Sequence, residues 1–424
     1  MYQVSDSGAV LRGHRRLLSR GRSDARVSRT VVLLGLTSLL TDISSEMVVT
    51  VLPLYLLYVG GFSPLAFGLI DGIYNGATAI VRLASGFIGD RWRRHKEVAV
   101  AGYGLSAICK FLLLTVGTAV SAIGAVVLLD RVGKGIRTAP RDAMISLAVP
   151  REQLSTAFGV HRAMDTTGAL LGPVVAFGLL ALAPFAFDSV FVVSLCLAVL
   201  GVGVLVVFVQ PRGQDRDAAP AAPSLRRAVG LVRVPRYRAL LISGGALSVA
   251  TASDAFVFLI LQERISLGMS LFPLLFVGSA ATFMVLAIPM GRLADRVGRG
   301  RVLLGGYALL LGVYLVLLAP VGGWAPLVSA LALLGGYYAA TDGVLMAFGS
   351  AVVPEEVRGS GLALLGTVTS LGRLVASLLF GLLWTVWGAD AALVCFSVAL
   401  VVAAALTAVM FARTREARVV PTRP

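Results

Sequence analysis

Hydrophobic residues fall along this chain in long continuous runs, without the alternation of apolar and polar residues that a membrane β-barrel strand shows. A run of about 20 apolar residues is the length that an α-helix needs to cross the hydrocarbon core of a bilayer. Dividing the chain at its Pro, Gly and charge clusters predicts twelve spans: 30–59, 64–89, 98–118, 121–141, 155–182, 189–210, 239–262, 271–291, 302–319, 326–350, 361–384 and 391–412. The pattern therefore predicts an all-α membrane protein with twelve transmembrane helices.

Composition and charge distribution agree with this topology. Of the 424 residues, 57% are hydrophobic and 14% are charged, whereas a soluble domain carries about 25% charged residues. The net charge of +15 is distributed unequally between the two sides of the membrane. If the N-terminus is cytoplasmic, every Lys and Arg between the predicted spans lies on the cytoplasmic side except Arg264. We expect a multi-pass protein of the cell membrane with both termini cytoplasmic. Contact with the lipid bilayer and its anionic headgroups explains the basicity, so no nucleic acid is needed as a partner.

The sequence lacks the common motifs for metals and nucleotides. It contains neither a Walker A sequence nor an H-E-x-x-H sequence, so an ATP-driven pump and an intramembrane metalloprotease are disfavoured. The three cysteines, Cys109, Cys196 and Cys395, all fall inside predicted spans and have no metal-ligand spacing. We expect no metal and no cofactor.

The two halves of the chain repeat each other. "GFIGDRWRRHK" (86–96) follows the second span and "GRLADRVGRGR" (291–301) follows the eighth, and Glu46 and Asp254 occupy equivalent places in the two halves. The Pro-, Ala- and Arg-rich segment 211–238 separates the halves. We therefore expect two pseudo-symmetric six-helix bundles, as in a two-lobed transporter whose site lies between the lobes. The expected division is a basic cytoplasmic tail (1–28), the first bundle (29–210), a cytoplasmic linker (211–238), the second bundle (239–412) and a cytoplasmic C-terminal tail (413–424).

Three sequence motifs resemble those of the major facilitator superfamily. Segment 291–301 matches motif A, G-x-x-x-D-R-x-G-R-[RK], whereas its first copy has Arg93 in place of a glycine. "LLDRVGKGI" (128–136) resembles motif B, and "GALLGPVVAFG" (168–178), with Gly168, Gly172 and Pro173, resembles motif C of the antiporters in that superfamily. The resemblance covers both halves. It implies that superfamily's fold and a proton-antiporter-like bacterial subgroup, and a monomeric secondary transporter for a small molecule, not an enzyme.

The resemblance also implies a conformational latch at motif A. A small glycine allows two helices to approach closely, and an aspartate at the end of a span can cap the N-terminus of a neighbouring helix. The alternative is a basic loop that only obeys the topology. The latch residues would be Gly86, Asp90 and Arg91 in the first half, and Gly291, Asp295 and Arg296 in the second.

Charged residues inside the spans indicate a transport pathway, because each costs free energy in a membrane helix. Asp42 and Glu46 share one face of the first span. The resemblance implies that the first, fourth, seventh and tenth spans line the central cavity, and all four carry charge. On the fourth span Arg131, Lys134, Arg137 and Arg141 fall within an arc of about 120°, and the seventh and tenth spans carry Asp254 and Asp342.

These charges suggest how protons could be coupled to transport. A carboxyl group holds its proton more tightly in an apolar cavity than beside an arginine. Asp42 or Glu46 would carry the proton, and Arg131 would set its affinity by approaching or leaving. Lys134, Arg137, Asp254 and Asp342 would line the substrate cavity. The alternative is a fixed ion pair between Asp42 or Glu46 and Arg131 or Lys134 that only joins the first and fourth spans.

Further polar residues have local explanations. His161, Arg162 and Asp165 are spaced for pairing within the fifth span. Lys110, near the middle of the third span, must have a partner. The G-x-x-x-G-x-x-x-G pattern of Gly68, Gly72 and Gly76 indicates close helix packing.

The sequence leaves three functions open. The first is proton-coupled efflux, by antiport, of a small organic solute or drug. The second is an importer or exchanger of a small organic anion, a carboxylate or phosphate ester, which the excess of cations on the fourth span favours. The third is a non-transporting membrane sensor or lipid-handling protein, which the short outward loops disfavour. Resemblance at the level of the fold does not identify the substrate.

Overall fold

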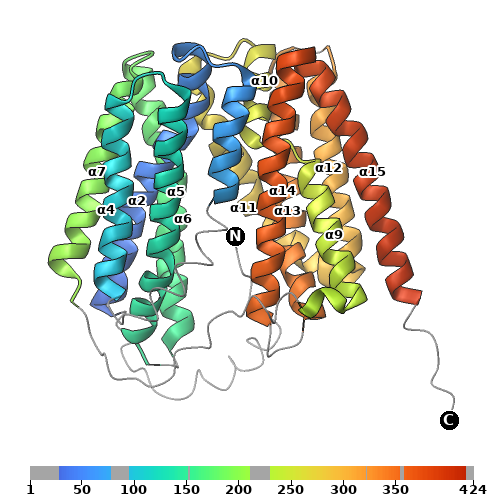
Figure 1. Cartoon of the computed structure of the whole chain (residues 1–424), viewed down its shortest axis with the longest axis horizontal. Coiled ribbons are helices and arrows are strands. Elements are labelled where there is room, and N and C mark those ends of the chain that lie inside the picture. Colours follow the sequence, from blue (N-terminus) through green and yellow to red (C-terminus); the bar gives the residue numbers. More distant parts are fainter. Residues whose placement is uncertain are drawn as a thin grey trace.

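The computed structural model describes residues 28–77, 95–150, 153–210, 230–320, 322–353 and 358–416, and within these ranges every regular element is a helix. The helices form two groups that lie side by side (Figure 1). The first group contains α2 (Arg29–Leu54) with its π-helical end η1 (Tyr55–Val59), a helix over residues 64–77, α4 (His95–Thr115), α5 (Val120–Leu147), α6 (Leu154–Leu182) and α7 (Phe187–Phe208). The second contains η3 (Leu231–Arg233), α9 (Pro235–Val249), α10 (Asp254–Arg264), η4 (Met269–Leu271), α11 (Phe272–Val297), α12 (Arg299–Leu318), α13 (Trp324–Val352), α14 (Arg358–Trp387) and α15 (Ala389–Glu416).

Ten helices in the described ranges are long and apolar enough to cross a membrane, with α9 and α10 counted as one. The remaining two predicted spans differ from these for separate reasons. The helix that begins at residue 64 is described only as far as residue 77. Helix α5 has 28 residues, which is ample length, but six of them are charged, namely Asp130, Arg131, Lys134, Arg137, Arg141 and Asp142.

The seventh span, predicted as one helix over 239–262, is interrupted in its middle. Helix α9 ends at Val249, and α10 begins at Asp254 after Ser253, whose extended backbone (φ −69°, ψ 151°) suits the residue before a helix. The interruption frees backbone groups that lipid could not satisfy. Tyr314 of α12 satisfies two of them, because its hydroxyl accepts from the Ala252 N–H (2.8 Å) and donates to the Ala250 carbonyl (3.2 Å).

The two groups of helices meet along the helix of residues 64–77, which lies against α14 (Figure 1). A Cβ atom on Gly68 would come within 2.4 Å of the Ser377 carbonyl oxygen, and one on Gly381 within 2.5 Å of the Pro64 carbonyl oxygen. The predicted close packing of the glycine pattern is therefore confirmed, and its partner belongs to the other half of the chain. Hydrogen bonds add to this contact, from the Leu65 N–H to Thr385 Oγ1 (2.9 Å) and from the Ser377 hydroxyl to Asp71 (2.6 Å).

Candidate functional site

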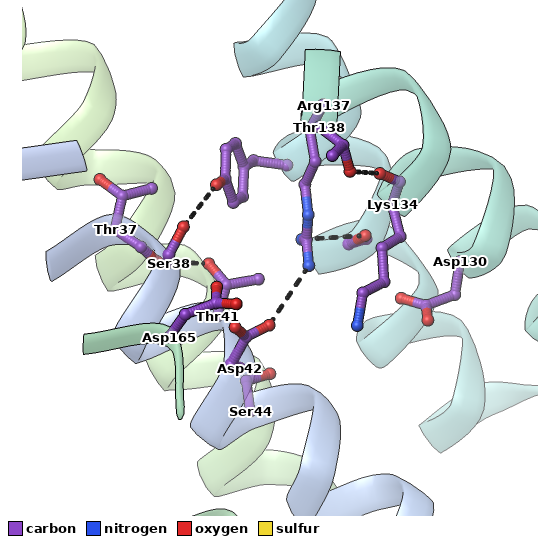
Figure 2. A network of polar contacts seen from close by, with 12 residues as sticks. Thr37, Ser38, Thr41, Asp42, Ser44, Asp130, Lys134, Arg137, Thr138 and Asp165 are labelled. Atoms are coloured by element: carbon purple, nitrogen blue, oxygen red, sulfur yellow. Dashed lines mark hydrogen bonds and ion pairs between the residues drawn. The ribbon is translucent and has the colours of Figure 1, made fainter. Parts of the chain in front are cut away.

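Asp42 lies in a buried polar cluster between α2, α5 and α6 (Figure 2). Its carboxylate is 3.8 Å from the guanidinium of Arg137, which stacks over the Tyr103 ring, 4.5 Å from the ring centre. Asp165 of α6 lies beside Asp42 in the same cluster (Figure 2). A carboxylate is only an acceptor, so two carboxyl groups can share a hydrogen bond only when one of them carries a proton. Two neighbouring carboxyl groups in one cluster are therefore a candidate place for a proton.

The motif C glycines place α6 against the acidic face of α2. A Cβ atom on Gly168 would come within 2.6 Å of the Leu39 carbonyl oxygen and 3.2 Å of the Asp42 Cβ atom. One on Gly172 would come within 2.7 Å of the Glu46 Cβ atom. Only residues without side chains fit at these two positions, and Pro173 follows them directly within α6. The G-x-x-x-G-P pattern thus brings α6 within contact of both carboxylates of the first span.

The cations of α5 are largely neutralised within the first group of helices. Arg131 pairs with Asp130, which also pairs with Lys110 at 3.1 Å, so Lys110 has the partner that its position requires. The Arg131 guanidinium lies over the Tyr74 ring, 4.1 Å from the ring centre. Among the described residues Arg131 makes no ion pair with an acid of the first span, so the alternative of a fixed pair at Arg131 is not seen. Arg137, further along α5, pairs with Asp42. Lys134 lies within electrostatic range of Asp42 and Glu46.

Asp165 has a partner on another helix as well as one nearby in its own helix. The predicted local pair with Arg162 exists, at 3.3 Å, but Arg141 of α5 also approaches Asp165, at 3.7 Å. His161 bonds to the Ser38 hydroxyl at 3.0 Å, which in turn bonds to the Tyr103 hydroxyl at 3.1 Å. Sequence reasoning assigned Asp165 to local structure. Asp165 precedes Gly168 by three residues and Gly172 by seven, so all three share one face of α6. This shared face was the available signal that Asp165 faces α2.

A cavity of about 250 Å³ lies between the two groups of helices, and its polar wall comes from both. The first group contributes Glu46 and Asp71, and the second contributes Asp254 and Arg373. A second cavity of about 240 Å³ shares Glu46 and Asp254 with it and adds Asp342. Of the predicted charged residues, the two cavity walls thus contain Glu46, Asp254 and Asp342, whereas they do not contain Asp42, Arg131, Lys134 or Arg137.

Three of the four wall acids have hydroxyl or arginine partners. The break between α9 and α10 puts Asp254 at the start of α10, where its Oδ1 accepts from the Tyr338 hydroxyl at 2.6 Å. Asp342 pairs with Arg373 at 3.6 Å. Sequence reasoning missed Asp71, which accepts from Ser377 across the contact between the two groups. An acid between two glycines of a helix-packing pattern was the available signal.

The structure describes the motif A residues of the second half but not those of the first. Gly86, Asp90 and Arg91 lie outside the described residues. In the second half Asp295 pairs with Arg299 at 3.6 Å, and Arg296 lies in the last turn of α11. Among the described residues no atom lies within 4 Å of a Cβ atom placed on Gly291, so the latch stays a prediction.

Long apolar helices in two groups, with a charged cavity between them, define a multi-pass membrane protein of the transporter type. The sequence profile of the Major Facilitator Superfamily matches residues 34–287 and 242–423. The chain therefore belongs to the major facilitator superfamily, whose members are transporters, and both the family and the all-α fold predicted from the sequence are confirmed.

Relatives and solved structures agree with this assignment. An uncharacterised MFS-type transporter of Methanocaldococcus jannaschii is 34% identical over 384 residues, which is 87% of this chain and 92% of that protein. The crystal structure of the nucleoside transporter NupG has a TM-score of 0.75 at 16% identity, covering 90% of this chain and 99% of the other. A POT family transporter in complex with 5-aminolevulinic acid has a TM-score of 0.72 at 12% identity, covering 92% and 96%. The two solved structures show the fold alone.

Proposed function

We propose that this protein is a proton-coupled transporter of the cell membrane that exports a small organic solute in exchange for protons. The observation that carries this proposal is the juxtaposition of the Asp42 and Asp165 carboxyl groups on neighbouring helices, the first buried and the second partly buried (Figure 2). This pair holds a proton as long as nearby positive charge does not displace it. Lys134, Arg137 and Arg141, all on α5, supply that positive charge.

The packing around the pair lets its surroundings change. Helices α2 and α6 pack along most of their lengths, whereas α5 contacts either of them at few points. The carboxyl pair therefore stays together while α5 moves, and the distance from Arg137 to Asp42 is the variable. When α5 approaches, the proton leaves, and when α5 retreats, a proton returns. This role was predicted for Arg131, and we now assign it to Arg137.

Glu46 links the proton to the solute. It lies one helical turn from Asp42 on the same face of α2, and it lines both cavities between the groups of helices. A shift of α2 and α6 that accompanies protonation therefore also moves the cavity wall. The motif C glycines transmit this shift, because they leave no space between α6 and α2 at Asp42 and Glu46.

Exchange of organic anions receives less support. The cations that favoured it are paired with acids inside the first group of helices, Arg131 with Asp130 and Arg137 with Asp42. Neither cavity wall contains these arginines. The direction of transport, export, rests on the resemblance of 168–178 to motif C.

The test is proton movement in vesicles. Cells with and without the protein are exposed to a panel of toxic cations, anions and neutral compounds, and each compound that the protein exports is added to everted vesicles with a pH-sensitive dye. Asp42→Asn and Asp165→Asn should abolish solute-driven proton release, whereas Asp188→Asn, at an exposed acid of α7, should not. Unchanged proton release in both variants would mean that Asp42 and Arg137 form only a fixed pair joining helices. Export without any proton movement in the natural chain would refute proton coupling itself.

A further inference from the structure

The walls of the two cavities are predominantly acidic. They contain four carboxyl groups, those of Glu46, Asp71, Asp254 and Asp342, and one cation, Arg373. Arg373 is paired with Asp342. Among the described residues no ion pair reaches any of the other three acids. An excess of one charge sign in a cavity with low-dielectric walls attracts solutes of the opposite sign.

The same wall is rich in aromatic rings. Phe67 and Tyr74 come from the first group of helices, and Phe276 and Tyr338 come from the second. The faces of aromatic rings attract cations, and quaternary ammonium groups in particular are bound between such rings. Arg131 lies over the Tyr74 ring, 4.1 Å from the ring centre, which is an example of this attraction in the same structure. Carboxylates together with rings suit a cation that has an apolar body.

The acids are arranged for an organic cation more than for a metal ion. Within the described residues no three Asp, Glu, His or Cys side chains come close enough together to hold a metal. Three of the carboxyl groups, those of Glu46, Asp71 and Asp254, instead line a cavity of about 250 Å³, with Asp71 from one group of helices and Asp254 from the other. The Ser253 hydroxyl, which lies beside Asp71 at the helix break, is buried and makes no hydrogen bond of normal geometry.

We propose that the solute is an organic cation, a protonated or quaternary amine with an apolar body, whose charge is bound between Asp71 and Asp254. The Ser253 hydroxyl accepts a hydrogen bond from a protonated amine, and the rings surround the apolar body. Because Asp71 and Asp254 belong to different groups of helices, the cation joins the two groups across the cavity. This inference rests on the proposed transport function and names its substrate class.

The test is binding to the purified full-length protein in detergent, without a proton gradient. The probes are two cations of different size, benzyltrimethylammonium and tetraphenylphosphonium, whose charge does not change with pH, and one anion, benzenesulfonate. Saturable binding is expected for at least one cation and not for the anion. Asp71→Asn and Asp254→Asn should each weaken cation binding about tenfold, the loss of one charge-assisted contact. Asparagine keeps an acceptor for the Ser377 and Tyr338 hydroxyl groups, so both variants should fold.

Two control variants sharpen the result. Asp188→Asn removes an exposed acid of α7 and should leave the affinity unchanged. Arg373→Gln removes the one cation of the wall and frees Asp342, so it should strengthen cation binding. Absence of saturable binding of either cation to the natural chain, equal binding of the anion, or unchanged affinity in both Asn variants would each overturn the proposal. Because no gradient is present, cation binding without proton exchange in vesicles would refute proton coupling and leave this inference standing.

Discussion

Gly172 of α6 lies directly against Glu46 of α2, so closely that a Cβ atom on the glycine would come within 2.7 Å of the Glu46 Cβ atom. The same Glu46 lines both cavities between the two groups of helices. One helix contact therefore connects motif C to the wall of both cavities. Gly168 makes the matching contact one turn earlier, at Asp42.

A methyl group at position 172 should destabilise the protein. In Gly172→Ala the new Cβ atom would also meet the Ile43 carbonyl oxygen at 2.9 Å, and backbone cannot move aside as a flexible side chain can. Overpacking of this kind costs about 1–3 kcal/mol, which should appear as a lower Tm in detergent. Gly178→Ala in the same helix meets no atom of the described residues within 4 Å and is the matched control. Equal Tm values for the two variants would contradict the close contact.

The ion cluster of Asp130 should be far more sensitive to loss of its acid than to loss of one cation. Asp130→Asn leaves the buried Lys110 and Arg131 without their common partner, and breaking a buried pair in this way costs about 3–5 kcal/mol. Lys110→Met leaves Asp130 paired with Arg131 and should cost clearly less. Thermal unfolding of the two purified variants compares them, and a larger loss in Lys110→Met would contradict the assignment of Arg131 as the second partner.

Tyr314 should stabilise the break between α9 and α10 through its hydroxyl group. Tyr314→Phe removes the partner of the Ala252 N–H and the Ala250 carbonyl, and a buried polar group without a partner costs about 1–3 kcal/mol. A lower Tm is expected, together with weaker cation binding, since the break positions Asp254. Tyr55→Phe is the control, because Tyr55 packs on Phe187 and Phe191 through its ring. A Tm for Tyr314→Phe equal to that of the control would show that the break does not depend on the hydroxyl.

The contact between residues 64–77 and α14 should control which end of the transporter is closed. In Gly68→Ala the added methyl group would lie 2.4 Å from the Ser377 carbonyl oxygen, so the two groups of helices must separate along this contact. We expect reduced oxidative cross-linking between cysteines placed at Leu65 and Thr385, which touch across the contact. The background is a chain with its three native cysteines replaced by alanine. Gly104→Ala, whose added methyl group meets nothing within 4 Å in the described part of the chain, should leave cross-linking unchanged.

The residues of the candidate site were predicted unevenly from the sequence. Asp42, Glu46, Asp254 and Asp342 could be recognised as unusual because any ionisable group in an apolar run is costly. Arg131 was predicted to act on Asp42 or Glu46, whereas the structure pairs Arg137 with Asp42. Helical periodicity gives the angular position of a cation but not the helix that it faces. Asp71 and Asp165 were missed for a related reason, since each has a nearby polar or glycine neighbour that offers a local explanation.

The sequence by itself determined the class of this protein, its helices and the location of charge within them. Lipid permits few solutions, so long apolar runs dictate helices, and the repeated motifs identify the superfamily. Only the tertiary structure decided which charges meet, because pairing depends on distances between helices that lie far apart in the chain. Glycines 168 and 172 brought α6 against Asp42 and Glu46, and the break at residues 250–253 turned Asp254 into the cavity. Both effects arise from close packing and backbone hydrogen bonding across the bundle, which no single stretch of sequence contains.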